Sequence, residues 1–105
     1  MKTVKERYYP LGDGKKLLAR EEYNNDKRDG LSEKWYEHGQ LMQRVNYKNN
    51  KMNGLFESWY PNGTLSIRAN YKNGKQNGLV ESWYPDGTLT RRSIYKNDKW
   101  VENIK

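Results

Sequence analysis

Apolar and polar residues alternate along short segments of this chain, and turn residues interrupt the alternation at regular intervals. From residue 65 to residue 71, for example, Leu, Ile, Ala and Tyr alternate with Ser, Arg and Asn. A period of two is typical of a β-strand with one buried face, and no segment shows the period of an amphipathic helix. Turns recur about every twelve residues, so we expect an all-β fold, an antiparallel β-meander of about eight or nine strands.

The alternation belongs to a 24-residue unit that recurs in tandem. The copy that begins at Gly54 reads GLFESWYPNGTLSIRANYKNGKQN, and the next copy begins again with GLVESWYPDG at Gly78. Each unit predicts one β-hairpin and the turn that leads to the next hairpin. We divide the single repeat domain 1–105 into a degraded copy at 6–29, repeats at 30–53, 54–77 and 78–101, and a short C-terminal cap at 102–105. A worn terminal copy is expected where an array must be capped.

Two kinds of turn separate the predicted strands. The Pro-Asn-Gly segment 61–63 has the sequence of a three-residue hairpin loop, because Pro presets φ and Gly supplies the left-handed position. We interpret the Lys-Asn-Gly segment 72–74 as the same kind of loop at the opposite end of the strands. These loops predict that Tyr60 pairs with Thr64 and that Tyr71 pairs with Lys75.

Counting outward from these pairings assigns the two faces of the sheet. The first, apolar face carries Leu55, Trp59, Leu65, Ile67, Ala69, Tyr71 and Leu79, with Glu57 among them. The second face carries Phe56, Ser58, Tyr60, Thr64, Ser66, Arg68 and Asn70. The repeat then predicts two ladders on the first face, Trp35, Trp59 and Trp83, and Tyr23, Tyr47, Tyr71 and Tyr95. In the same register, each of Arg20, Arg44 and Arg68 is expected opposite Gly30, Gly54 or Gly78.

The composition fits a thin structure with one modest apolar face. Charged residues make up 31% of the 105 residues and the apolar set 33%, figures that on their own indicate disorder. Four Trp, nine Tyr and one Phe argue instead for a core built from large rings. Aliphatic residues are too few for a two-layer globule, so we expect a single-layer sheet. The chain has no cysteine, which excludes disulfides and thiolate metal sites.

The net charge of +7 favours an acidic or phosphate-bearing partner, although it is also explained by solubility alone.

The N-terminal segment of the chain, residues 1–9, contains charged residues and no apolar run. Such a segment does not resemble a signal peptide, so we expect a cytoplasmic protein.

Arginines and tyrosines that recur at the repeat spacing form the first set of candidate binding residues. They are Arg20, Arg44, Arg68 and Arg92, with Tyr36, Tyr60 and Tyr84 on the same predicted face. Tyr and Arg are enriched at protein interfaces, which favours a partner-binding role. The alternative is structural: each arginine covers the space above a glycine and packs its stem on Phe56 or Val80.

Lysines at the Asn-containing turns form the second set. They are Lys48, Lys51, Lys72, Lys75, Lys96 and Lys99, with Lys27 and Arg28 in the degraded copy. This edge of the sheet is expected to be strongly basic, whereas the edge with the Pro turns is nearly neutral. A basic strip can steer an acidic partner. The alternative is that turn lysines provide solubility and discourage aggregation of strands.

The residues G-L-x-E-x-W-Y-x-x-G-x-L and Y-K-N-x-K resemble the variant MORN repeat found in small bacterial proteins of the YwqK antitoxin type. The resemblance covers nearly the whole chain, from about Tyr8 to about Trp100. It implies a fold of tandem β-hairpins that serves as a binding scaffold, with an antitoxin-like or inhibitor-like role toward another protein.

No catalytic, metal-binding or cofactor-binding pattern is recognisable in the sequence. His38, the single histidine, occupies a turn position that is Asn or Asp in the sister copies, and Glu33, Glu57 and Glu81 recur with the repeat. We therefore predict a non-enzymatic protein-binding module without a cofactor. Its expected partner is a protein with an acidic surface, such as a toxin or a nucleic-acid-handling enzyme. The alternatives are binding of nucleic acid or anionic lipid through the basic edge, self-association, and a structural scaffold.

Overall fold

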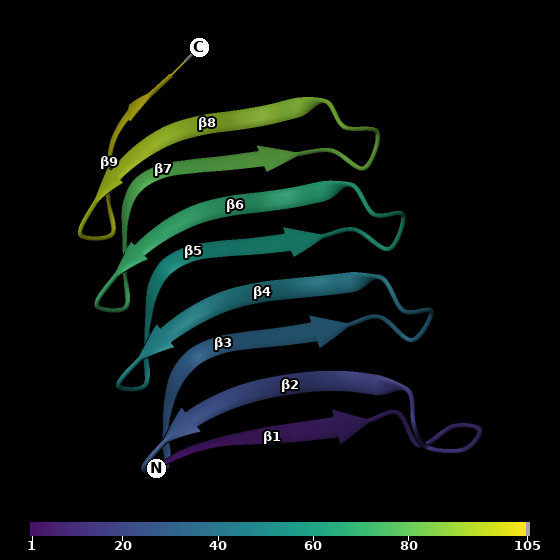
Figure 1. Ribbon diagram of the computed structural model, residues 1–105. Helices are drawn as coiled ribbons and strands as arrows, with labels where there is room; N and C mark the ends of the chain where they lie inside the picture. Colours follow the sequence, from purple (N-terminus) through teal and green to yellow (C-terminus); the bar gives the residue numbers. More distant parts are fainter. Residues whose placement is uncertain (105) are drawn as a thin grey trace.

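In the computed structural model, which describes residues 1–104, nine strands form one open sheet and follow one another in chain order (Figure 1). The strands are β1 (Lys2–Tyr8), β2 (Leu17–Asn24), β3 (Lys27–Trp35), β4 (Leu41–Lys48), β5 (Lys51–Trp59), β6 (Leu65–Lys72), β7 (Lys75–Trp83), β8 (Leu89–Lys96) and β9 (Lys99–Asn103). Every neighbouring pair is antiparallel. The predicted all-β meander is confirmed. The cap predicted at 102–105 falls partly outside the described residues.

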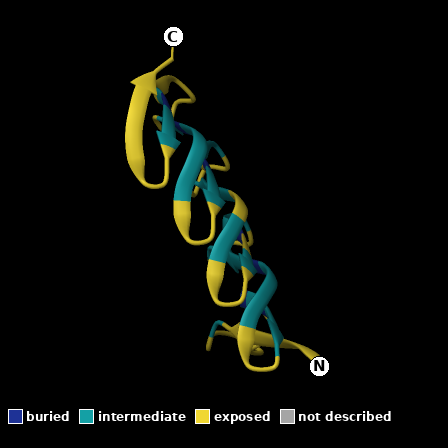
Figure 2. Cartoon of the chain, turned by 90° about the vertical axis from the view of Figure 1, so that its left-hand side faces the viewer, coloured by how far each residue is buried: buried dark blue, intermediate teal, exposed yellow. Residues whose placement is uncertain are grey.

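The sheet is a single layer with very little interior. Its Cα atoms span 47 × 36 × 12 Å, and all nine strands of the described residues belong to the same hydrogen-bonded sheet. Among the described residues, the fully buried apolar side chains are Ala19, Val45 and Ala69. The turns are exposed and the strands are mostly half-buried (Figure 2). Between Met1 and Ile104 the chain forms no helix, and so none that is long and apolar enough to cross a membrane.

One row of cross-strand neighbours forms the centre of this thin core, and we call it the core row. From β1 to β9 it consists of Lys5, Glu21, Ser32, Val45, Phe56, Ala69, Val80, Ser93 and Asn103. Directly opposed side chains of an antiparallel pair lie on the same face, so this row marks one face of the sheet. The row is apolar in its middle and polar at both ends.

The Asn-containing turns differ from the prediction. Lys72 pairs directly with Lys75, which leaves a two-residue loop of Asn73 and Gly74 with φ of 51° and 84°. Positive φ at both loop residues defines a type I′ turn, whose twist matches that of the flanking strands, and Asn-Gly is its preferred sequence. The predicted three-residue loop at this end is therefore wrong, and Tyr71 pairs with Gln76 rather than with Lys75.

The Pro-containing turns are three-residue loops, as predicted. Tyr60 N donates to Thr64 O at 2.8 Å, and Gly63 N donates to Tyr60 O at 2.9 Å. One residue further along, however, the register shifts: Trp59 pairs with Leu65, but Ser58 pairs with Ile67. Ser66 is thus an extra residue, a β-bulge, and an extra residue exchanges the faces of everything that follows it on that strand.

This bulge corrects the predicted faces. Glu57 pairs with Arg68, so these two side chains share a face, whereas the prediction placed them on different faces. Phe56 pairs with Ala69 and shares the other face with it, again contrary to the prediction. The Tyr71 ring contacts Phe56 on the core-row face, with ring centroids 6.1 Å apart. The Trp59 ring lies under the guanidinium of Arg44, 5.8 Å away, on the other face. The Trp and Tyr ladders therefore lie on opposite faces, whereas the prediction placed them together.

Each internal hairpin bends near its Asn turn (Figure 1). Gly54 lies at the bend with φ of 106°, a conformation that only glycine adopts without strain, and it pairs with Tyr71 rather than with an arginine. The predicted arginine–glycine register is therefore wrong. Beyond the bend, each Asn turn contacts the preceding hairpin directly: Asn50 N donates to Arg28 O at 2.9 Å, and Arg28 N donates to Asn50 Oδ1 at 2.8 Å.

Candidate functional site

The fold brings the six predicted lysines together along the side of the sheet where the strands end in the Asn turns. They form the cross-strand pairs Lys48–Lys51, Lys72–Lys75 and Lys96–Lys99, one pair at each of three successive Asn turns. All six side chains are exposed, and we call this set the lysine edge. Turns of successive hairpins are two strands apart, so the pairs repeat about every 9.5 Å along the edge.

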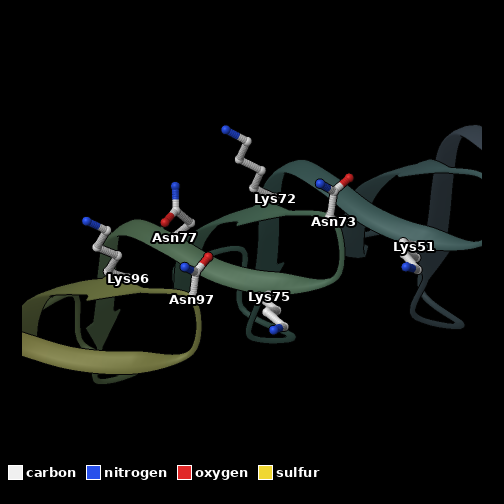
Figure 3. A pocket seen from close by; sticks show the side chains of 7 residues that line it. All are labelled: Lys51, Lys72, Asn73, Lys75, Asn77, Lys96 and Asn97. Carbon is white, nitrogen blue, oxygen red and sulfur yellow. The ribbon is translucent and has the colours of Figure 1, made fainter.

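Two shallow depressions lie between these turns. The larger has a volume of about 540 Å³ and is lined by Lys51, Lys72, Asn73, Lys75, Asn77, Lys96 and Asn97 (Figure 3). The smaller has a volume of about 380 Å³ and is lined by Lys48, Asn49, Lys51, Asn53, Lys72 and Asn73. The two depressions share Lys51, Lys72 and Asn73, so they adjoin along the three turns, and we call them together the basic groove.

The charge of this groove is not neutralised within the protein. Of the ion pairs formed within residues 1–104, none involves a residue of the lysine edge. The lining consists of ammonium groups and side-chain amides. Both donate hydrogen bonds to oxygen atoms, and the groove is therefore suited to carboxylates or phosphates.

The recurring arginines form a different arrangement. Arg44 lies in register between Glu33 and Glu57, and Arg68 lies between Glu57 and Glu81. The complete row alternates carboxylate and guanidinium side chains across eight strands. It consists of Glu6, Arg20, Glu33, Arg44, Glu57, Arg68, Glu81 and Arg92. We call this row the Glu–Arg ladder.

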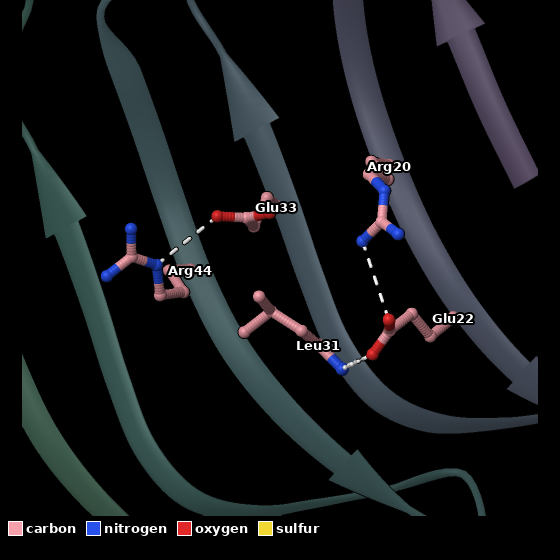
Figure 4. A network of polar contacts seen from close by, with 5 residues as sticks. All are labelled: Arg20, Glu22, Leu31, Glu33 and Arg44. Carbon is pink, nitrogen blue, oxygen red and sulfur yellow. Dashed lines mark hydrogen bonds and ion pairs between the residues drawn. The ribbon is translucent and has the colours of Figure 1, made fainter. Parts of the chain in front are cut away.

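Contacts within the ladder follow one pattern in the later repeats. Arg44 Nε contacts Glu33 Oε2 at 3.3 Å, Arg68 Nε contacts Glu57 Oε2 at 3.4 Å, and Arg92 Nε contacts Glu81 Oε2 at 2.8 Å. In the first copy, Arg20 instead contacts Glu22, which also accepts a hydrogen bond from Leu31 N at 2.7 Å (Figure 4). The alternation of charges leaves the ladder neutral as a whole, so it adds no net charge to that face.

Two of the three predicted tyrosines are engaged inside the protein. Tyr36 OH donates to Trp59 O at 2.7 Å, and Tyr60 OH donates to Trp83 O at 2.7 Å, which ties each repeat to the next. Tyr9, which the sequence reasoning did not single out, makes the same contact with Trp35 O at 2.6 Å. Tyr84 is 58% exposed. A binding role for the ladder arginines and for these tyrosines stays a prediction.

The asparagines of the groove were treated only as turn formers by the sequence reasoning. Asn49, Asn73 and Asn97 recur at the repeat spacing beside the lysines, and that coincidence is the signal that marks them as part of the site. In the part of the chain that the structure describes, no group of three His, Cys, Asp or Glu residues is arranged to hold a metal ion.

These features define the class of the protein: an open array of tandem β-hairpins in a single sheet. A family model described as the MORN repeat variant matches three tandem segments, 28–49, 52–73 and 76–97, which together cover more than half of the chain. The chain belongs to the MORN repeat variant family. No curated protein shows significant similarity to the chain. MORN repeats are non-catalytic modules associated with binding to proteins or membranes.

Proposed function

We propose that the protein is a non-enzymatic binding module that grips an acidic surface of another protein with its lysine edge and thereby blocks that protein. The observation that carries this proposal is the groove across the Asn turns, whose two depressions are lined by lysine and asparagine alone. A groove with this lining attracts carboxylates strongly and discriminates against basic or apolar surfaces.

The lysine edge is favoured over the Glu–Arg ladder as the binding surface because carboxylates of the protein itself compensate the charges of the ladder arginines. Each of Arg44, Arg68 and Arg92 has a carboxylate within 3.4 Å, so a partner that used these arginines would compete with an intramolecular contact. The lysines have no such competitor among the described residues. Binding an acidic partner at the lysine edge therefore costs no existing ion pair.

A protein partner is favoured over nucleic acid by the absence of stacking surfaces in the groove. Binders of single strands combine positive charge with aromatic side chains on which the bases stack. Neither depression is lined by an aromatic residue. The edge is also narrow, because the whole sheet spans 12 Å in its shortest dimension. A narrow strip fits a groove or ridge on a protein better than the broad plane of a membrane.

Blocking is the expected consequence of this geometry. Tyr–Trp contacts and docked Asn turns tie each hairpin to the next, so the array presents its lysines on a stiff frame. A stiff frame loses little conformational entropy on binding. Once seated, the sheet covers the acidic site of its partner, as an antitoxin-like or inhibitor-like protein would.

The proposal is tested by a charge-matched pair of variants. In Lys72→Gln/Lys75→Gln, two charges are removed from the groove, and in Lys15→Gln/Lys16→Gln two charges are removed near the opposite edge. Wild-type protein and both variants are immobilised, used to capture partners from extract of the native host, and compared by mass spectrometry. The captured partner is then purified, and its affinity and its activity are measured with each form.

We expect the groove variant to lose at least about tenfold in affinity, which is the effect of about 1.4 kcal/mol, and to relieve inhibition in proportion. The control variant should keep affinity within about twofold. Equal losses in the two variants would contradict the role of the groove. Tighter binding to mixed-sequence RNA or to phosphatidylserine vesicles at physiological salt, with a steep dependence on salt, would replace the protein partner with a phosphate-bearing one.

A further inference from the structure

The first repeat breaks the pattern of the core row. Glu21 stands at the position that is Val45, Ala69 and Ser93 in the later copies, and its residue is only 4% exposed. A buried carboxylate is costly unless cations and hydrogen bonds compensate it. A charged residue at a core position of one repeat alone therefore marks a feature that the other repeats do not share.

Two arginines hold this carboxylate. Arg7 NH2 donates to Glu21 Oε1 at 3.1 Å, and Arg28 NH2 lies 3.0 Å from Glu21 Oε2, an oxygen that accepts no hydrogen bond within the described residues. The position of Arg28 is Met52, Gln76 or Trp100 in the later copies. Glu21 and Arg28 thus form a pair that is specific to the first repeat.

The pair lies in a concave site. A depression of about 480 Å³ is lined by Lys5, Glu6, Arg7, Glu21, Tyr23 and Arg28, and the Lys5 ammonium lies 4.6 Å from the centre of the Tyr23 ring. The side chains of Arg7 and Arg28 are 59% and 41% exposed. Each contacts Glu21 through one terminal nitrogen, and Arg28 NH1 also donates to Tyr47 OH at 3.3 Å. A guanidinium carries five N–H groups, so both arginines keep N–H groups for a ligand. We call Lys5, Arg7, Glu21 and Arg28 the arginine cluster.

The charge of the cluster favours an oxyanion. Lys5, Arg7 and Arg28 carry three positive charges against the single negative charge of Glu21. Glu6 is the other acidic residue of the lining, but neighbouring residues of a strand point to opposite faces, so its carboxylate lies on the side of the Glu–Arg ladder. Glu21 orients the two guanidinium groups, and a planar guanidinium is suited to a carboxylate that it can contact through two nitrogens.

The cluster adjoins the lysine edge. The backbone of Arg28 exchanges hydrogen bonds with Asn50, which lies in the turn between Lys48 and Lys51. The arginine cluster therefore lies on the core-row face of the hairpin next to Lys48 and Lys51, where an acidic partner bound at the lysine edge can also place a carboxylate.

A periodic edge has a difficulty that this arrangement resolves. Shifting a partner by one repeat, about 9.5 Å, replaces each lysine pair by an equivalent pair, so the edge alone does not define a register. We propose that the arginine cluster is the anchor site for one carboxylate side chain of the acidic partner, and that it sets the register of that partner along the lysine edge. The inference rests on the proposed function, since it assigns the anchor within the same interaction.

The test uses a synthetic peptide of six glutamates with a nitroxide label at its N-terminus. Six extended residues span about 20 Å, or about two repeats, so the peptide can occupy several registers on one array. The label broadens the amide NMR signals of nearby residues in isotope-labelled protein. The comparison variant is Glu21→Val/Arg28→Met, which introduces the residue types of the second repeat and removes one charge of each sign, so the net charge stays at +7.

In the wild-type protein we expect broadening concentrated around the first two hairpins, with the anchored register favoured about tenfold, the effect of one charge-assisted contact. In the variant the broadening should spread over all the Asn turns. Arg7→Gln, a change at an exposed residue of the edge strand β1, should weaken the preference in the same way and serves if the double variant does not fold.

The outcomes separate the anchor from the proposed function. Even broadening in the wild-type protein, or concentrated broadening that persists in both variants, would overturn the anchor while peptide binding at the lysine edge stands. Absence of peptide binding to the wild-type protein at low salt would overturn the acidic-partner function itself, and the anchor with it. Equal displacement of the peptide by inorganic phosphate and by glutarate would overturn the assignment of the site to a carboxylate.

Discussion

Arg92 Nε donates a hydrogen bond of 2.8 Å to Glu81 Oε2, and the carboxylate side chain that accepts it is only 7% exposed. Glu81 also lies in register with Arg68 on its other side. The equivalent contact between Arg68 and Glu57 is longer, 3.4 Å, and its arginine is more exposed. The Glu–Arg ladder is therefore strongest near the C-terminal end of the array, where the carboxylate is most deeply buried.

Removing the contact between Arg92 and Glu81 should destabilise the protein more than removing the equivalent contact between Arg68 and Glu57. We expect Glu81→Gln to lower the free energy of unfolding by about 1–2 kcal/mol, because a hydrogen bond between charged groups at a buried carboxylate is lost. Glu57→Gln, the control, should cost less than about 1 kcal/mol, as is usual for a more exposed pair. Urea titrations of both variants measure the difference, and equal losses would contradict the ranking.

The tyrosine contacts between repeats provide a second comparison. Tyr60→Phe deletes the 2.7 Å hydrogen bond to Trp83 O and should cost about 1 kcal/mol, since the carbonyl loses its partner in a partly buried setting. Tyr84→Phe is the matched control, because Tyr84 is 58% exposed. Its melting temperature should stay unchanged within about 1 °C. A shift of similar size in both variants would show that the hydroxyl contact does not tie the repeats together.

Glycines at the bend and in the turn should respond differently to substitution. Gly54 has φ of 106°, outside the left-handed helical region, so Gly54→Ala should cost about 1–3 kcal/mol through backbone strain. Gly74 has φ of 84° in a type I′ turn whose sister turn carries Asn50 at φ 69°, so Gly74→Asn should be tolerated within about 0.5 kcal/mol. Chemical denaturation of the two variants tests this. A tolerated alanine at the bend would disprove the strain argument.

Low pH should destabilise the last Pro turn by protonating Asp86. A backbone hydrogen bond from Thr88 N, 2.9 Å from Asp86 Oδ1, is the main cause that lowers the pKa of this carboxyl below 3.8, and the Thr88 side chain adds to it. A lowered pKa means that the ionised group stabilises the fold above the ordinary pKa and that this contribution is lost as the pH falls through the lowered value.

We therefore expect the Asp86 carboxyl to titrate below 3.8 in a carbon-13 NMR experiment. The stability advantage of the wild-type protein over Asp86→Asn should be present above the ordinary pKa of 3.8 and should shrink as the pH falls below it. Asparagine is the matched replacement because Asn62 accepts the same hydrogen bond from Thr64 N, at 2.9 Å, in the preceding repeat. A midpoint at or above 3.8 would contradict the role of the Thr88 contact.

Sequence reasoning predicted the strands and the Pro-containing turns correctly, whereas the loop length predicted for the Asn-containing turns was wrong. The alternation between residues 65 and 71 and the regular turns were enough for an all-β meander, because a strand and a hairpin loop depend on neighbours in the chain. The six lysines were correctly assigned to one edge, since every repeat carries them at the same place beside its turn. A repeat makes one local inference valid in each copy.

Only the tertiary structure decided which residues share a face. The extra residue at Ser66 leaves no distinctive mark in the sequence, yet it places Arg68 beside Glu57 and separates the Trp ladder from the Tyr ladder. A bulge is fixed by hydrogen bonds to the neighbouring strand, and a shift of one residue exchanges the two faces. The ion-pair partners of Glu21 could not be predicted from the sequence either. Arg7 and Arg28 contact it only because strands β1, β2 and β3 lie side by side.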